Sequence, residues 1–334
     1  MPAELSHGLP ELITRGNRIL RADTMQPILL RGVNRSGLEY VKPSEAGFLS
    51  AAGLNFEEIA HICLGWRCSV LRLPFNQASA LYSKNGHSAE QYLSTLDQVI
   101  SWAARCGCYT ILDLQWFDTE TVYGCCKDSS GAQVANRVPP LPNPDTVSLW
   151  DTLALRYRDE PAVLFDLLNE PHPRCQDDRN PIYLVGPGGE ILQSDSHAVG
   201  PQEWLDWATF LVSRVRQQRP AGLILVGGAN WAFDLRGIRI DAPNIVYSAH
   251  IYPNRKPSTW WKAIGRSNQL PVFIGEWGGT ERDLAFGRRL AGEMRSRDLG
   301  WTAWSWADHP HLVQSPRAPD YVPTAFGELV RAEL

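Results

Sequence analysis

Two glutamates stand at the ends of apolar runs that lie far apart in the sequence. Glu170 ends the run LFDLLNE directly before a proline, and Glu276 lies in VFIGEWGG. An apolar run that stops abruptly at polar residues is typical of a buried strand whose end reaches a pocket. Paired carboxyl groups across a cleft are what glycoside hydrolysis requires, because one protonates the leaving oxygen while the other attacks the anomeric carbon or activates water.

Polar or aromatic residues also follow the other apolar runs. They are Asn34, Arg72, Gln115, Trp116, Asn169, Trp231, His250, Tyr252, Trp277, Trp304 and Trp306. The chain holds 13 tryptophans, and several fall where packing alone would not need them. Because the C–H faces of sugar rings lie well on indole, we expect a tryptophan-lined cleft around the two carboxylates. Taken singly, Glu170 could cap a helix after Pro171, and Arg72 or His250 could be structural.

Eight short runs rich in leucine and β-branched residues would position these side chains. They span 27–34, 69–75, 109–116, 162–170, 222–228, 244–252, 271–277 and 301–306. Most are continuous rather than alternating, which predicts strands buried on both faces of a parallel sheet. Helical spacing of apolar residues falls between them, at 54–65, 90–105, 146–157, 202–219, 280–298 and 323–333. This alternation predicts an α/β fold, a (β/α)₈ TIM barrel, as a single domain over 1–334.

Other segments are expected to close the two ends of this barrel. The stretch NRILRADTMQPILL has a polar break between two apolar runs and predicts a hairpin on the barrel floor. Two long connections, 117–145 and 171–201, follow the third and fourth strands and should wall the cleft. Tyr123, Tyr183 and Asp195 are candidate contacts on them. A doubly wound open sheet is the alternative fold, but no Gly-x-Gly-x-x-Gly motif follows the first strand.

Bulk properties exclude several classes of protein. A net charge of −4 with dispersed basic residues gives no support for a nucleic-acid partner, and no apolar stretch reaches the ~20 residues of a membrane span. No signal peptide is visible, so either the protein stays inside the cell or a leader was removed. We expect a monomer.

The seven cysteines do not indicate a metal site. The pairs Cys106/Cys108 and Cys125/Cys126 lack the spacing of a zinc knuckle, and no His-x-His pattern completes a site. We expect Cys63, Cys68, Cys106 and Cys108 to be buried thiols. A bridge from Cys125 or Cys126 to Cys175 stays open.

The motifs LFDLLNEPH, SAHIYP and VFIGEWGG resemble those of glycoside hydrolase family 5, and the similarity runs from NRIL to WTAWSW. The resemblance implies a retaining barrel enzyme without metal or cofactor. Glu170 then matches the general acid/base and Glu276 the nucleophile. The supporting residues that match are Arg72 beside the nucleophile, Asn169 at the sugar 2-hydroxyl, His250 and Tyr252 beside the carboxylates, and Trp304 under the sugar.

The chemistry agrees with these roles. Glu276 must be ionised to attack, and Arg72 with the Tyr252 hydroxyl would stabilise that charge. Glu170 must start protonated, which a less polar setting and the charge of Glu276 would favour. A retaining mechanism requires the two carboxyl groups to stand about 5–5.5 Å apart.

One residue departs from the family pattern. Where much of the family has Asp-Leu-His at the end of the third strand, this chain has Asp-Leu-Gln, ending in Gln115. We expect an endo-β-1,4-glucanase acting on a β-linked oligo- or polysaccharide, with Gln115 and Trp116 in the binding pocket. A β-mannanase or another β-glycosidase is the alternative, and a carbohydrate-binding pseudoenzyme is a third hypothesis. Trp301, Trp306 and one of the pair Trp260–Trp261 are expected to serve packing.

Overall fold

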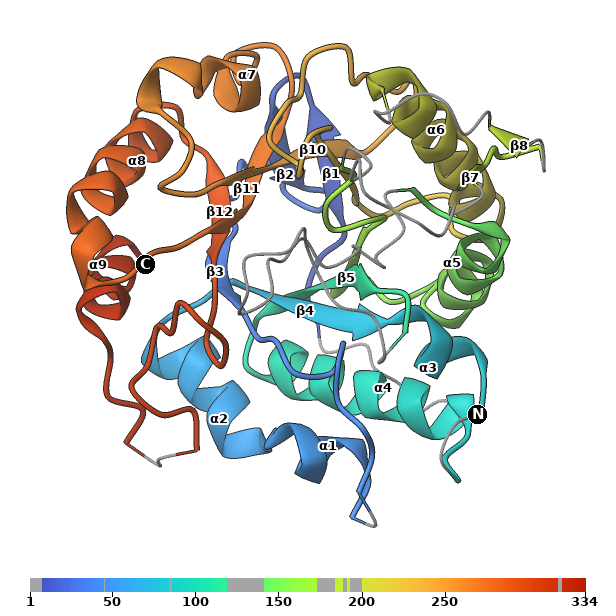
Figure 1. Cartoon of the computed structure of the whole chain (residues 1–334), viewed down its shortest axis with the longest axis horizontal. Coiled ribbons are helices and arrows are strands. Elements are labelled where there is room, and N and C mark those ends of the chain that lie inside the picture. The colour runs from blue at the N-terminus through green and yellow to red at the C-terminus, as the bar shows by residue number, and fades with distance from the viewer. Residues whose placement is uncertain are drawn as a thin grey trace, which may run out of the picture.

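A closed barrel of eight parallel strands forms the centre of the molecule (Figure 1). The computed structural model describes residues 8–44, 46–83, 86–118, 141–172, 184–188, 191–192, 200–317 and 320–334. The strands are β3 (Arg31–Asn34), β4 (Val70–Asn76), β5 (Tyr109–Trp116), β6 (Val163–Asp166), β9 (Ile224–Gly227), β10 (Ile245–Ile251), β11 (Val272–Trp277) and β12 (Gly300–Ala303). Each lies within or overlaps one of the eight apolar runs, which confirms the predicted barrel.

Helices surround the barrel (Figure 1). The longer ones are α4 (Ala89–Arg105), α5 (Pro144–Arg156), α6 (Pro201–Gln218), α8 (Leu284–Ser296) and α9 (Ala325–Glu333). The predicted helix at 54–65 is α2 (Phe56–Ala60) continued by the π-helix η1 (His61–Gly65). Short elements escaped prediction because they span too few residues to show a period: α1 (Gly47–Ala52), α3 (Gln77–Leu81), η2 (Pro257–Thr259) and α7 (Trp261–Ile264). The 3₁₀ turn η3 (Glu281–Asp283) lies at the start of the predicted helical segment 280–298.

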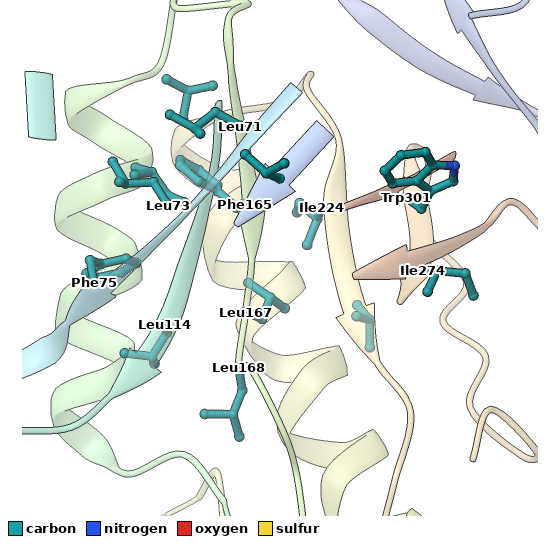
Figure 2. Close-up of a cluster of buried hydrophobic side chains, with 14 of the residues drawn as sticks. Leu71, Leu73, Phe75, Leu114, Phe165, Leu167, Leu168, Ile224, Ile274 and Trp301 are labelled. Carbon is teal, nitrogen blue, oxygen red and sulfur yellow. The ribbon is translucent and has the colours of Figure 1, made fainter. Parts of the chain in front are cut away.

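Successive residues of each strand face opposite sides of the barrel wall. Along β4, Leu71, Leu73 and Phe75 point to the same side and join the large core between strands and helices (Figure 2). The alternate residue Val70 belongs to a second apolar cluster, inside the barrel. Arg72 follows two positions later, so the same geometry turns it inward as well. The wall therefore places a charged group in the interior by register alone.

A hairpin closes the barrel end where the strands begin. It consists of β1 (Leu12–Arg15) and β2 (Arg18–Arg21), and Leu12 packs in the inner apolar cluster. The predicted hairpin over residues 17–30 was right about the floor but misplaced the first strand. A second turn does bring Ile28 back, with its backbone N–H donating to the carbonyl of Ile19 at 3.0 Å.

Several expectations fall wholly or largely outside the described residues. These are the walls at 117–145 and 171–201, of which only the ends and the small antiparallel pair β7 (Leu184–Val185) and β8 (Ile191–Leu192) are described, the contacts of Tyr123, Tyr183 and Asp195, and the bridge from Cys125 or Cys126 to Cys175. None of the described helices is both long and apolar enough to cross a membrane.

The four expected buried thiols divide into two kinds. Cys63, Cys68 and Cys108 are buried and carry free thiols, as predicted. The expectation was wrong for Cys106, which is free but only partly buried. Cys106 is the C-cap of α4, where the chain leaves the helix before β5, so its side chain is not enclosed on every side.

Candidate active site

Arg72 is the centre of the polar group at the mouth of the barrel. It is fully buried on β4 and donates hydrogen bonds to four side chains at the ends of three other strands. One terminal nitrogen donates to Glu276 Oε1 at 2.8 Å and to Asn34 Oδ1 at 2.9 Å. The other donates to Asn169 Oδ1 at 2.9 Å and to Asp166 Oδ2 at 3.0 Å. These bonds fix the guanidinium rigidly among the strand ends.

Three carboxyl groups surround this single guanidinium. Asp113 on β5 lies 2.9 Å from Arg72 and Asp166 on β6 lies 3.0 Å from it, opposite Glu276. Burial raises the pKa of Asp166 to about 6 against the attraction of Arg72, and burial raises the pKa of Asp113 well above its ordinary value. One positive charge cannot neutralise three buried negative ones, so the site retains a proton on its aspartates.

Glu276 ends the inward face of β11 with both carboxylate oxygens engaged. Oε1 accepts from Arg72, and Oε2 accepts from the hydroxyl of Tyr252 at 2.7 Å. The residue is only 4% exposed. Burial, followed by the negative charge of Glu276, raises the pKa of Tyr252 well above its ordinary value, so Tyr252 stays a hydroxyl donor. Two donors thus hold Glu276 as a fixed carboxylate, the state a nucleophile needs.

Glu170 lies at the cleft side of this group. Its side chain is 12% exposed, and its Oε1 lies 2.9 Å from Nδ1 of His250. The same imidazole nitrogen lies 3.6 Å from Oε2 of Glu276. One ligand atom from each of these three residues lies within 4.8 Å of the others. The two glutamate side chains therefore meet over one imidazole.

His250 holds these carboxylates as a neutral ring. Burial lowers its pKa to about 3, so it carries a single N–H at ordinary pH. Nδ1 faces the carboxylates, which makes it the donor, and no described residue forms a hydrogen bond with Nε2. Gly275 leaves room for this ring, because a Cβ there would lie 2.9 Å from Nε2.

The same three residues have the donor atoms of a divalent-metal site. Among the described residues, Glu170, His250 and Glu276 are the group whose ligand atoms converge in this way. Arg72 and Tyr252, however, already donate to both oxygens of Glu276. A cation would face the guanidinium at close range, so the electrostatics favour the hydrogen-bonded arrangement.

A cleft of about 580 Å³ opens above the two glutamates. Its walls include the predicted Gln115, Trp116, Glu170, His250, Tyr252, Glu276 and Trp304, while Arg72 and Asn169 are buried beneath. Trp231 lines it too, stacked on His172 with ring centroids 4.1 Å apart. No described residue donates a hydrogen bond to the buried Oε1 of Gln115, so this oxygen can accept one in the cleft.

The remaining tryptophans mostly serve packing. Trp301 and Trp306 are buried, as predicted, and so is Trp277, whose ring meets Trp301 edge to face. Of the tandem pair, Trp260 is buried and donates to the carbonyl of Arg255, whereas Trp261 is 56% exposed.

Sequence reasoning missed part of the cleft and of its support. The missed residues are Glu39, Tyr40, Asn254, Arg255 and Asp308 in the walls, and Asp166 beneath them. Asp166 left one signal, because it interrupts the apolar run LFDLL as Asp113 interrupts ILDLQ, but that signal does not show to which side of the wall the side chain points. Glu39 and Tyr40 follow the first barrel strand within a few residues, at the end where barrel sites lie.

Sequence comparison places the chain among known proteins. The model of the Cellulase family, glycosyl hydrolase family 5, matches residues 26–310. The chain belongs to this family. Cellulase CelDZ1 of Thermoanaerobacterium sp is 24% identical over 312 residues, covering 88% of this chain and 69% of that protein. Endoglucanase A of Evansella cellulosilytica is 21% identical over 291 residues, covering 84% of this chain and 49% of that protein. The chain thus spans about half the length of that relative.

Solved structures share the fold. The catalytic domain of Thermobifida fusca endoglucanase Cel5A, in complex with cellotetraose, has a TM-score of 0.70 and 18% identity, with 99% of each chain covered. A β-glucanase from Saccharophagus degradans, also in complex with cellotetraose, has a TM-score of 0.71 and 20% identity, with 96% of this chain and 92% of that chain covered. At these identities the likeness shows the barrel alone.

Proposed function

We propose that this family 5 member is a retaining glycoside hydrolase whose nucleophile is Glu276 and whose acid/base is Glu170. The meeting of the two carboxylates carries the proposal. One oxygen of each carboxylate lies within 4.8 Å of one oxygen of the other, which fits the ~5–5.5 Å between carboxyl groups of a retaining pair better than the ~6.5–9.5 Å that an inverting enzyme needs for water. Their environments also differ, with Arg72 on Glu276 and His250 on Glu170.

The first step forms a glycosyl ester. A carboxylate oxygen of Glu276 bonds to the anomeric carbon as the glycosidic C–O bond breaks, and the leaving oxygen takes a proton from Glu170. Asn169 turns its amide oxygen to Arg72, so its contribution to a sugar 2-hydroxyl comes from the amide nitrogen as a donor. That bond strengthens as positive charge develops on the ring.

The second step hydrolyses the ester. Glu170, now a carboxylate, takes a proton from water, whose oxygen bonds to the anomeric carbon while the bond to Glu276 breaks. Two displacements restore the β configuration. His250 remains neutral throughout and holds Glu170 in place between the two steps.

The substrate that we propose is a β-linked glucan, cut internally at β-1,4 bonds. The matching relatives are named cellulases and endoglucanases, and two matching structures hold cellotetraose. Tyr40 after β3, Trp116 at the end of β5 and Trp231 after β9 line the cleft, and in the order of the barrel the strands leading to Glu170 and Glu276 lie between these aromatic residues. Such walls suit sugar rings on both sides of the cleaved bond.

Removal of each glutamate separates the two roles. Glu276→Ala should lose activity by a factor of at least about 10³, and added azide should restore turnover with an α-glycosyl azide as product. Glu170→Ala should retain more activity on aryl β-glycosides with acidic leaving groups than on cello-oligosaccharides, because such groups need no proton. Undiminished turnover in either variant would overturn the assignment, and a parent protein that binds sugar without turnover would support a pseudoenzyme.

Gln115 gives a specific reason to test a second substrate. Its buried Oε1 has no hydrogen-bond partner among the described residues and can accept a hydrogen bond from a ligand. Much of the family has a histidine here, so this chain lacks that titratable group. A panel of cellulose oligomers, mannan oligomers and aryl β-glycosides, compared by kcat/KM, ranks the endoglucanase against the β-mannanase or another β-glycosidase. Faster cleavage of mannan oligomers would replace the glucan assignment and leave the two-glutamate mechanism intact.

A further inference from the structure

The cleft contains a third glutamate, which is buried and which the proposed mechanism does not use. Glu39 lines the cleft yet is only 1% exposed. Its Oε2 accepts from the backbone N–H of Gly37 at 2.6 Å, and its carbonyl accepts from Asn76 Nδ2 at 2.8 Å. The hydroxyl of Tyr92 on α4 holds the same loop in place by donating to the carbonyl of Leu38 at 2.8 Å. The carboxyl group is therefore held in position before any ligand arrives.

No cation among the described residues pairs with this carboxyl group. Arg35, whose charge attracts Glu39, is committed to Glu58 at 2.9 Å and to the carbonyls of Ala52 and Gly53. Its attraction is smaller than the effects of burial, backbone hydrogen bonds and Asp308 on Glu39. A buried carboxylate without a cation is costly, whereas a buried carboxylic acid needs only ordinary hydrogen bonds.

Burial and the neighbouring charge of Asp308 favour the protonated form of Glu39. Burial raises the pKa of Glu39 to about 8, and the negative charge of Asp308 acts in the same direction, against the Gly37 hydrogen bond and Arg35. The other titratable groups facing it are Asp113 on β5, Tyr92 on α4 and its neighbour Tyr40, each of which senses Glu39 electrostatically. At neutral pH the group is an un-ionised acid, and it can donate a proton in a hydrogen bond.

The walls beside Glu39 have the make-up of a sugar subsite. Tyr40 and Trp116 approach each other with ring centroids 5.8 Å apart, and both line the cleft. The Tyr40 hydroxyl donates to Asp308 Oδ1 at 2.8 Å, which ties the loop after β3 to the loop after β12. Two aromatic faces with fixed polar groups beside them are typical of sites that bind and orient sugar rings.

We propose that Glu39 is a specificity residue of this cleft, which donates a hydrogen bond from its carboxylic acid to a hydroxyl of a neutral sugar ring lying against Tyr40 and Trp116. The inference rests on the proposed glycosidase function and deepens it. Asp308, whose negative charge acts on Glu39, accepts a hydrogen bond from Tyr40. Glu39 and Asp308 therefore offer the sugar one donor and one acceptor. Ionisation of Glu39 removes this donor, so the sugar hydroxyl keeps the contact only by turning its own proton to Glu39 and away from Asp308, which weakens binding.

The experiment measures KM and kcat for cellotetraose from about pH 6 to pH 9.5 in the full chain. In the parent protein, KM should rise as pH passes about 8, the pKa of Glu39. Glu39→Gln keeps a donor that does not titrate, so its KM should stay level over the same range. Glu39→Ala should raise KM about tenfold already at pH 6.5, more than Glu39→Gln does, with a smaller change in kcat.

Two further variants sharpen the result. Asp308→Asn removes the neighbouring negative charge and should move the rise in KM to lower pH. Glu57→Gln removes an exposed glutamate on α2 and should leave the parent profile unchanged. Circular dichroism establishes that each variant is folded at every pH used.

The possible outcomes separate this inference from the proposed function. A level KM in the parent protein, or a rise that persists in Glu39→Gln, overturns the role of Glu39 while leaving the hydrolase intact. Absence of turnover on every β-glycoside overturns the hydrolase instead. In that case calorimetry of cellotetraose binding over the same pH range still decides whether Glu39 donates to the sugar.

Discussion

The interior of the barrel has two layers, built by the same strands a few residues apart. Near the strand starts it is filled by Val70, Ile111, Leu164, Leu225, Val246 and Phe273, sealed by Leu12 of the hairpin. Two residues further along, three of these strands carry Arg72, Asp113 and Asp166 instead, all fully buried. A step of two residues, about 6.6 Å along a strand, changes the medium from hydrocarbon to a charged network.

The difference shows where stability and chemistry are placed. The floor, which is the inner apolar cluster near the strand starts, buries side chains that need no hydrogen-bond partner. Among the described residues, the mouth leaves several buried polar atoms without one, including Oδ2 of Asp113, Oγ of Ser248 and Nε2 of His250. Each such atom costs about 1–3 kcal/mol in an ordinary interior. The preformed site at the mouth therefore lowers the stability of the fold, and the apolar packing of the floor offsets this cost.

Substitution of two of the buried arginines, Arg72 and Arg219, gives the strongest contrast. Arg72→Met should lower kcat/KM by at least about 10³ and the free energy of unfolding by about 3–5 kcal/mol, because Glu276 and two aspartates lose their cation. Arg219 lies outside the mouth, where it donates to the carbonyls of Glu160 and Val163.

Arg219→Met is the matched control for that prediction. It should also lower stability in denaturant unfolding, because two buried carbonyls lose their donor, but kcat/KM of the folded protein should not change. If both variants lost activity equally, a general loss of structure would explain the effect, and the distinction between mouth and remainder would fail.

The floor is tested by one leucine on β6. Leu164→Ala should lower the free energy of unfolding by about 2–5 kcal/mol, because it opens a cavity in the inner apolar cluster. Its kcat/KM should stay within about twofold of the parent value, since no residue of the mouth loses a contact. Chemical denaturation and steady-state kinetics on one preparation measure both. A stable variant with poor turnover would show that the floor shapes the site directly.

The sequence predicted the wall of the barrel better than what the wall encloses. Continuous apolar runs report burial on both faces, so all eight strands were visible without a structure. Glu170 and Glu276 were visible because each ends such a run. Asp166 was not singled out, because an aspartate within LFDLL has no sequence signal that distinguishes an inward from an outward side chain. Only the register against Arg72 shows that it faces the barrel axis.

Non-local features explain the other misses. Glu39 is significant because Arg35 is committed to Glu58 and because Asp308, from the far end of the chain, lies nearby. Neither fact is encoded in the SGLEY segment itself. The first strand of the floor hairpin was missed for a similar reason, since Leu12–Arg15 is short and its burial depends on the barrel that it covers.

The smallest expected effect is the change in stability with pH that comes from the proton held by the buried Asp166. Asp166 has an ordinary pKa near 3.8, and burial raises it to about 6 in the folded protein. Between about pH 4 and pH 6 the folded protein therefore holds a proton that the unfolded chain has released. Its free energy of unfolding should fall as pH rises through this window, with a slope of at most about 1.4 kcal/mol per pH unit for one proton.

Asp166→Asn removes this titration while keeping the shape of the side chain. The variant should gain stability relative to the parent as pH rises from about 4 to 6, and above that range the difference should be constant. Asp23→Asn is the control: the side-chain hydrogen bond from Arg21 lowers the pKa of Asp23, so its contribution is lost only at lower pH. Urea unfolding at successive pH values measures the differences. Parallel curves for parent and Asp166→Asn would mean that Asp166 is ionised in the folded protein over this range, as it is in the unfolded chain, and that Arg72 neutralises more of the buried charge than its geometry indicates.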